Sequence, residues 1–200
     1  MASSLVPIVV GFLLTTVLGG LLGSYLQQRA WRNQNEQRLR DDELKRAAAA
    51  CVEVSQLLDK RLYRMLRLFH TLASSGSDKE GFEHTVAARL ADYDAVLYDW
   101  NDRLNVNLSL VGTSFGQAAR DWLDRRVYEQ FKQTGALLEQ LVEQRSRNIG
   151  VMPNLNEVAS DLAKLNDDVY RLGVFMMSRL REGHVGRTVK DPLPEEQLQL

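Results

Sequence analysis

The sequence has few prolines, one cysteine and almost no net charge. Each of these features argues against a class of protein. The chain of 200 residues has four prolines, and none lies between Pro7 and Pro153. Because proline in a helix interior costs roughly 3 kcal/mol, this proline-free stretch is typical of a helical protein. A single cysteine, Cys51, excludes an intrachain disulfide. The net charge of −1 argues against nucleic acid as a partner, because nucleic-acid binding needs a basic surface.

The N-terminal segment lacks charge altogether. No acidic or basic side chain precedes Arg29, and residues 5–26 read LVPIVVGFLLTTVLGGLLGSYL. About 20 apolar residues cross the hydrocarbon core of a bilayer as a helix, so residues 1–26 are predicted to form a transmembrane anchor. The alternative is a cleaved signal peptide, which has a basic start and a shorter apolar run. The chain begins with MASS and its apolar run is longer, so the anchor is favoured.

Basic residues follow the predicted anchor, and none precedes it. Arg29, Arg32, Arg38 and Arg40 come soon after the apolar run. Lysine and arginine next to a membrane span are retained on the cytoplasmic side. We therefore expect a single-pass protein of the cell (inner) membrane, with its N-terminus outside and its C-terminal domain in the cytoplasm. Its first partner is then the lipid bilayer.

Small residues recur every four positions along the predicted anchor, at Gly11, Thr15, Gly19 and Gly23. Small side chains at this spacing let two membrane helices approach closely. The pattern predicts self-association through this face, and hence a homo-oligomer. Glycine and threonine are also common in membrane helices that do not associate, which is the alternative.

Beyond the anchor, the pattern of polar and apolar residues predicts a long helix. Residues 27–43 are polar on every side, and opposite charges lie four positions apart, as in Arg32 and Glu36. Such pairs stabilise a solvated helix, so this segment is predicted to be a helical stalk that continues from the anchor.

The remaining sequence predicts a helical bundle. From residue 44 onward, apolar residues recur at steps of three and four, which is the period of amphipathic helices that pack together. Short connections make neighbouring helices antiparallel. The predicted fold class is therefore all-α, with one transmembrane helix continuing into a stalk and an antiparallel four-helix bundle over residues 44–183. The four helices are expected at about 44–74, 78–111, 115–147 and 155–182.

Three local features of this bundle are also predicted. Ala48 and Cys51 lie on the apolar seam of the first helix. The sequence Gly112-Thr-Ser-Phe-Gly116 is expected to break the second helix, with Thr113 or Ser114 capping the third. Residues 184–200 have little apolar content and are predicted to be a disordered tail.

No residue pattern in the sequence indicates a reaction. The glycines at 112 and 116 lack the Lys-Ser/Thr that completes a phosphate-binding loop. Three histidines without matching Glu-x-x-His spacing do not predict a metal site. Cys51 on an apolar seam is typical of a buried, inert thiol. We predict no catalytic, cofactor-binding or metal site and no enzymatic activity, and no small-molecule substrate is evident.

One charged feature could be a site. Four basic side chains share one face of the first bundle helix: Lys60, Arg61, Arg64 and Arg67. The second helix has an acidic row that could pair with these basic side chains: Asp92, Asp99 and Asp102. The favoured interpretation is a set of ion pairs between neighbouring helices. The alternative is a binding face for an anion or a phospholipid headgroup.

The functional prediction follows from this architecture. We expect a membrane-tethered interaction or scaffold protein that acts at the cytoplasmic face, associates with itself through the anchor, and binds a protein partner that the sequence does not identify. The alternative is a membrane-acting effector or sensor whose oligomerised anchors disturb the bilayer.

Overall fold

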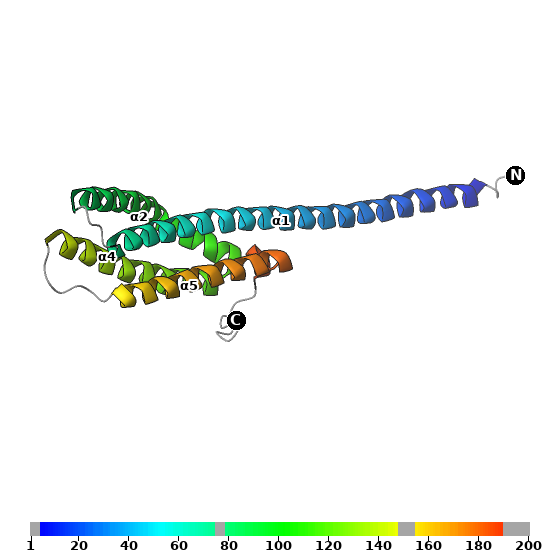
Figure 1. The fold of residues 1–200 in the computed structure, drawn as a ribbon. Helices are drawn as coiled ribbons and strands as arrows, with labels where there is room; N and C mark the ends of the chain where they lie inside the picture. The colour runs from blue at the N-terminus through cyan, green and yellow to red at the C-terminus, as the bar shows by residue number, and fades with distance from the viewer. Residues whose placement is uncertain (1–4, 75–78, 148–154, 190–200) are drawn as a thin grey trace. The chain divides into compact units, whose positions relative to one another are not determined.

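The computed structural model describes residues 5–74, 79–147 and 155–189. Within these ranges it describes the side chains of residues 11–12, 19–74, 80–145 and 155–189. Every regular element in the described ranges is a helix (Figure 1). The predicted all-α fold class is therefore confirmed for this part of the chain.

The helices follow one another with few connecting residues. Their order is α1 (Leu5–Ala73), α2 (Lys79–Phe115), α3 (Gln117–Asp121), the π-helix η1 (Trp122–Tyr128), α4 (Glu129–Arg147), α5 (Leu155–Glu182) and the 3₁₀-helix η2 (Gly186–Thr188).

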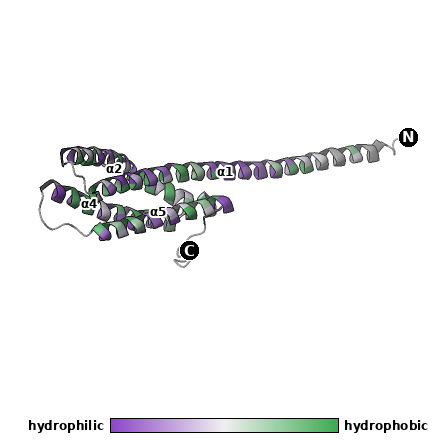
Figure 2. Ribbon diagram, viewed as in Figure 1, coloured by the Kyte–Doolittle hydropathy of each residue, from purple (hydrophilic) through white to green (hydrophobic). Residues whose placement is uncertain are grey.

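Helix α1 contributes to two separate units of the chain. The first unit is residues 1–42 and the second is residues 43–200, a division one residue before the expected end of the stalk. All the described side chains of the first unit are exposed. Figure 2 colours the middle of α1 mainly as hydrophilic, in keeping with the polar sequence of residues 27–43.

The predicted transmembrane helix receives no support from this structure. Among the described residues, no helix is both long enough and apolar enough to cross a membrane. Much of the predicted anchor falls on residues 5–10 and 13–18, whose side chains lie outside the described residues. The anchor therefore stays a prediction from the sequence.

One hydrophobic core runs through the second unit. The later part of α1, α2, the continuous rod formed by α3, η1 and α4, and α5 all contribute side chains to it. These four rods run in alternating directions (Figure 1). Met65, Leu68 and Leu72 of α1 and Leu165 and Leu172 of α5 are completely buried. Each such side chain stabilises the fold by about 1.5–3 kcal/mol relative to exposure.

The buried stripe of α1 is wider than the predicted seam. Leu57 and Leu58 are both buried although they are adjacent in sequence, so α1 is covered on more than one side. Cys51 is buried, as predicted. The expected position of Ala48 is wrong, because Ala48 is exposed and Ala47 is buried instead.

The second helix does not break at Gly112. It continues to Phe115, and the Gly116 N–H donates to the Gly112 carbonyl over 3.0 Å. The chain turns at Gly116, whose φ of 94° is a conformation that glycine adopts without a side-chain penalty. Gly116 also occupies the N-cap position of α3 without a side-chain hydrogen bond, so the expected cap by Thr113 or Ser114 is wrong.

The π-helix η1 was not predicted, and the spacing of buried residues explains it. Ala119, Leu123, Val127 and Phe131 are all buried and lie four positions apart. In an α-helix, each step of four residues rotates the side chain by about 40° away from its starting face. The i→i+5 hydrogen bonds of a π-helix widen the turn, which reduces this drift and keeps the four side chains directed at the core.

The segment expected to be a disordered tail begins with ordered residues. Val185 is buried, and the Arg187 Nε donates to the Glu43 Oε1 over 2.6 Å. The Thr188 hydroxyl donates to the Gly183 carbonyl over 3.0 Å. Residues 190–200, which make up the remainder of the predicted tail, lie outside the described residues.

Replacing one core leucine tests the shared core. Leu165→Ala is expected to lower the free energy of unfolding by about 2–5 kcal/mol, because it removes a fully buried side chain and leaves a cavity. Val106→Ala is the matched control, since Val106 is exposed and its loss is expected to change stability by less than about 0.5 kcal/mol. Urea unfolding followed by circular dichroism measures both. Equal effects of the two substitutions would contradict the described core.

Candidate functional site

The small residues of the predicted anchor lie on α1 in the first unit. A Cβ atom built at Gly11, Gly19 or Gly23 meets nothing within 4 Å. Substituting these glycines is therefore compatible with the isolated helix. The side chain of Thr15 lies outside the described residues.

Two members of the predicted basic face form ion pairs with α2. The Arg64 Nη1 lies 2.9 Å from the Asp92 Oδ2, and the Lys60 Nζ lies 3.9 Å from the Asp99 Oδ2. The interpretation as ion pairs between neighbouring helices therefore describes these two residues. Both pairs are partly exposed to solvent, and pairs near the surface contribute about 0–1 kcal/mol each.

Arg67 has a different environment from the two paired residues. Its Nη1 donates to the hydroxyl of Tyr63, one helical turn earlier, over 3.1 Å. The guanidinium also lies 5.8 Å from the centre of the Tyr63 ring. Arg67 therefore interacts within α1 in this structure.

Arg61 does not belong to the predicted face, because its side chain is inside the bundle. Only 2% of the residue is exposed. The guanidinium carbon lies 4.5 Å from the centre of the Phe131 ring, at cation–π distance. Burial lowers the pKa of Arg61, and the hydrogen-bonding hydroxyl of Tyr93 raises it in part. A single basic surface of four side chains is therefore absent from the described part of the molecule.

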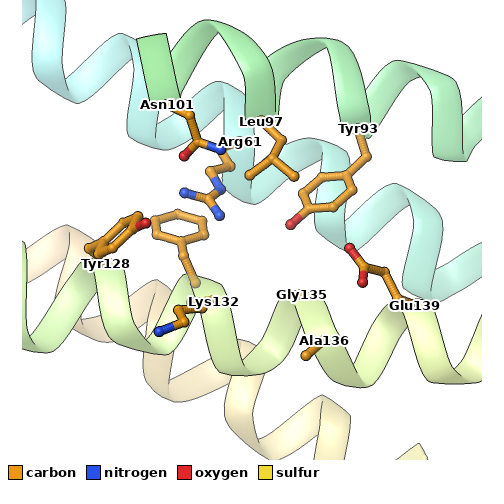
Figure 3. A pocket seen from close by; sticks show the side chains of 10 residues that line it. Arg61, Tyr93, Leu97, Asn101, Tyr128, Lys132, Gly135, Ala136 and Glu139 are labelled. Carbon is orange, nitrogen blue, oxygen red and sulfur yellow. The ribbon is translucent and has the colours of Figure 1, made fainter. Parts of the chain in front are cut away.

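Arg61 lies at a cavity of about 300 Å³ between α1, α2 and the rod of η1 and α4. Figure 3 shows the Arg61 guanidinium and the Tyr93 hydroxyl directed into the space between α2 and α4. The ring of Phe131 and the side chain of Leu97 supply apolar wall, and Tyr128 lies at the end of η1. The site thus combines one buried cation, two phenols and apolar surface.

Gly135 sets the position of Tyr93 in this cavity. A Cβ atom built at Gly135 would lie 2.8 Å from the Tyr93 hydroxyl oxygen, which is closer than Cβ atoms normally approach. The absence of a side chain at residue 135 therefore makes room for the hydroxyl. Burial also raises the pKa of Tyr93, which keeps the phenol protonated and neutral near neutral pH.

A buried carboxylate elsewhere in the core has the partners that Arg61 lacks. Asp168 of α5 is 4% exposed, and its Oδ2 accepts a hydrogen bond of 2.6 Å from the Gln130 Nε2. Its Oδ1 lies 3.1 Å from the Arg126 Nε. In contrast, the Nε and Nη1 of Arg61 are buried without a hydrogen-bond partner among the described residues.

A second concavity lies between α1 and α5. It has a volume of about 530 Å³ and is lined on the α5 side by Tyr170, Gly173, Val174 and Met177. Tyr170, Val174 and Met177 are each more than half exposed, which gives the groove an exposed apolar stretch on the surface of the second unit. Polar and charged side chains complete its lining: Ser55, Asp59, Asn166, Ser178 and Arg181.

Two of the sequence-based chemical expectations fall on described residues. Burial raises the pKa of the Cys51 thiol, and a hydrogen bond with Ser55 lowers it in part. The thiol is thus disfavoured as a thiolate, the reactive form of cysteine. In the described ranges, no group of three or more His, Cys, Asp or Glu side chains is placed to hold a metal ion.

Sequence reasoning missed the cavity, although a signal for it exists. Arg61 lies three positions after Leu58 and four before Met65, so it occupies a position of the apolar stripe. A charged residue at a seam position indicates a buried polar interaction, as it does in coiled coils. The hydroxyl of Tyr93 is the polar neighbour of Arg61 in the structure.

No protein family, curated protein or solved structure matches this chain. The assignment of function therefore depends on the residues of the chain itself.

The close approach of Gly135 and Tyr93 can be tested by a double-mutant cycle. Gly135→Ala is expected to lower the free energy of unfolding by about 1–3 kcal/mol, because the new methyl group displaces the Tyr93 hydroxyl. In a Tyr93→Phe background, which lacks that oxygen, Gly135→Ala is expected to lower the free energy of unfolding by a smaller amount. Urea unfolding of the original chain, the two single variants and the double variant gives the coupling free energy between residues 93 and 135. Strict additivity would contradict the described packing.

Proposed function

We propose that this chain is a membrane-tethered helical protein that binds other proteins at the cytoplasmic face and associates with itself through its anchor. The proposal has three parts, which are the membrane tether, the orientation and the interaction surface. Each part is supported by separate residues.

The observation that carries the proposal is the exposure of large apolar side chains in the first unit. Leu21, Leu22 and Leu26 are each about 61–62% exposed, and Trp31 is 65% exposed. Burial of a leucine side chain is worth about 1.5–3 kcal/mol, so several uncovered leucines on one helix favour an apolar medium around it. The uncharged run of residues 5–26 makes a lipid bilayer the medium of matching length.

Orientation and spacing follow from the residues after the apolar run. Arg29, Arg32 and Arg38 support a cytoplasmic location for the second unit, by the retention of basic residues on that side. Residues 27–42 are exposed and polar, as expected of a helix in water between a membrane and a folded unit.

The groove between α1 and α5 supports the interaction role. Tyr170, Val174 and Met177 lie at steps of four and three, so they form one apolar face of α5. An apolar face beside a groove is the surface that binds an amphipathic helix of a partner. The proposal is that a helix of a cytoplasmic or membrane-associated protein occupies this groove.

A crosslinked pulldown from carbonate-washed membranes tests the tether and the partner together. The full chain, tagged after Leu200, is expected to remain in the membrane pellet and to capture a distinct protein. Val174→Asp is expected to abolish this capture, because it places a charge in the apolar groove. The variant protein should still be found in the pellet.

The matched control for this experiment is Val106→Asp on α2. Val106 is similarly exposed, at 57%, but does not line the groove. It is expected to capture the partner as the original chain does. Release of the chain from washed membranes would refute the tether. Equal capture by the Val174→Asp variant would refute the role of the groove.

Self-association through the anchor predicts a specific sensitivity to side-chain size. Replacing Gly19 and Gly23 with isoleucine is expected to weaken association in a membrane two-hybrid reporter by a factor of several, since β-branched side chains hold the helices apart. The isolated helix tolerates the change, because a Cβ atom at either residue meets nothing within 4 Å. Replacing Leu21 and Leu22 with isoleucine is the control of equal apolarity. Unchanged signal in the glycine variant would remove the self-association claim.

A further inference from the structure

We propose that the cavity around Arg61 binds a small organic anion, with a single carboxylate directed at the guanidinium and a compact apolar body against Phe131. This proposal goes beyond the membrane-tethered interaction role and does not depend on it. It rests on a buried charge without a counter-ion, on a cavity beside that charge, and on the chemistry of the cavity wall.

The first argument is the state of the Arg61 guanidinium. An arginine has five N–H donors and stays charged in proteins. Its Nε and Nη1 have no hydrogen-bond partner among the described residues, and no ion pair found there includes Arg61. Neutral side chains such as Trp100 and Asn107 also have buried atoms without a hydrogen-bond partner. Among the described residues with such atoms, Arg61 is the charged residue.

The second argument compares the two buried charges of the core. Asp168 has an arginine and a glutamine within hydrogen-bond distance, so its charge is compensated inside the chain. Arg61 has only the face of Phe131 and the neutral hydroxyl of Tyr93. Burial of an uncompensated charge costs several kcal/mol, so an incoming anion would remove a large penalty.

The third argument is the shape and lining of the cavity. A volume of about 300 Å³ is at the lower limit of small-molecule pockets, so it selects a compact ligand. The hydroxyls of Tyr93 and Tyr128 can donate hydrogen bonds to a carboxylate, whereas Leu97 and Phe131 provide apolar contact. Three aromatic rings and a leucine favour an organic anion over an inorganic one.

The charges at the mouth of the cavity limit the ligand further. Lys132 and Glu139 of α4 line it and are exposed, as is Asn101 of α2. With Arg61, these groups give a net charge of about +1 at neutral pH from the ordinary charges of the side chains. A monoanion matches that charge, and a dianion would be repelled by Glu139.

Binding requires a small movement of Arg61. The Nε and Nη1 atoms have almost no accessible surface in this structure, so the guanidinium must shift toward the cavity to engage a carboxylate. The long arginine side chain allows such a shift through rotation about its own bonds. Exposed Asn101, Lys132 and Glu139 mark the entrance, which lies between α2 and α4.

The test is thermal unfolding of the full chain in detergent, with benzoate as the probe. Benzamide is the first control, because it has nearly the same shape as benzoate without the charge. Inorganic phosphate and chloride, added at equal ionic strength, are the other controls. Benzoate is expected to raise the Tm in a concentration-dependent manner, because a ligand that binds only the folded state stabilises it. Benzamide, phosphate and chloride are expected to have no comparable effect.

Arg61→Met separates a binding role from a structural one. If Arg61 serves the anion, the variant is expected to have a Tm equal to or above that of the original chain without ligand, since the uncompensated charge is gone. It is also expected to weaken benzoate binding at least about tenfold, the loss typical of a charged hydrogen bond. Arg64→Met is the matched control, one turn along α1 and outside the cavity, and it should keep the benzoate effect.

A second variant keeps the test decisive if Arg61→Met fails to fold. Ala136 lines the cavity from an exposed position of α4, so the larger side chain of Ala136→Phe is expected to occupy part of the cavity and to leave the buried core unchanged. It should fold and lose the benzoate effect. Equal shifts with benzoate and benzamide, a shift with phosphate alone, or a full benzoate effect in Ala136→Phe would each overturn the proposal.

Discussion

The later part of α1 carries apolar side chains on more than one side, and these side chains have to be covered from water. The other helices of the second unit are arranged around α1 to provide this cover. Adjacent residues such as Leu57 and Leu58 are both buried, which a single partner helix could not achieve. Helix α2, the rod of α3, η1 and α4, and α5 supply the missing cover through one core. The π-helix follows from the same demand, because residues four apart in that rod must all face inward.

Arg61 is the exception within this stripe, and its surroundings are organised to hold it. A hydrophobic residue at that position would complete the core with less cost, since a buried guanidinium without a carboxylate is unfavourable. The ring of Phe131 partly compensates the charge, and Gly135 leaves room for the Tyr93 hydroxyl beside it. The residues around the Arg61 cation therefore come from α2 and α4. Such local cost is characteristic of binding sites, where stability is exchanged for function.

The helical class and most core residues could be predicted from the sequence, because a period of three to four residues depends only on helix geometry. The ion pairs of Lys60 and Arg64 with α2 were also predictable, because opposite charges beside a seam pair across it. The prediction that Arg61 lies on a surface face is wrong, because its position in the apolar stripe directs it into the core although its charge favours solvent. The continuation of α2 through Gly112 was missed because glycine weakens a helix by only about 1 kcal/mol, which packing easily offsets. The position of Arg61 in the apolar stripe is a sequence signal for a buried charge, but the volume and the lining of the cavity depend on three-dimensional packing.

The two units meet the hydrophobic requirement in different ways, and this difference has consequences for their sequences. In the second unit the chain covers its own apolar surface, so substitutions in the core are restricted by volume. In the first unit the described chain does not cover Leu21, Leu22 and Leu26, so internal packing does not restrict the volume of these side chains. Residues 27–42 of the same unit are also exposed, and each pair of opposite charges four positions apart contributes only about 0.2–0.5 kcal/mol to the stability of the helix. Because residues 27–42 make no buried contact within the described chain, they should accept exchanges among polar residues that the buried core of the second unit would not accept.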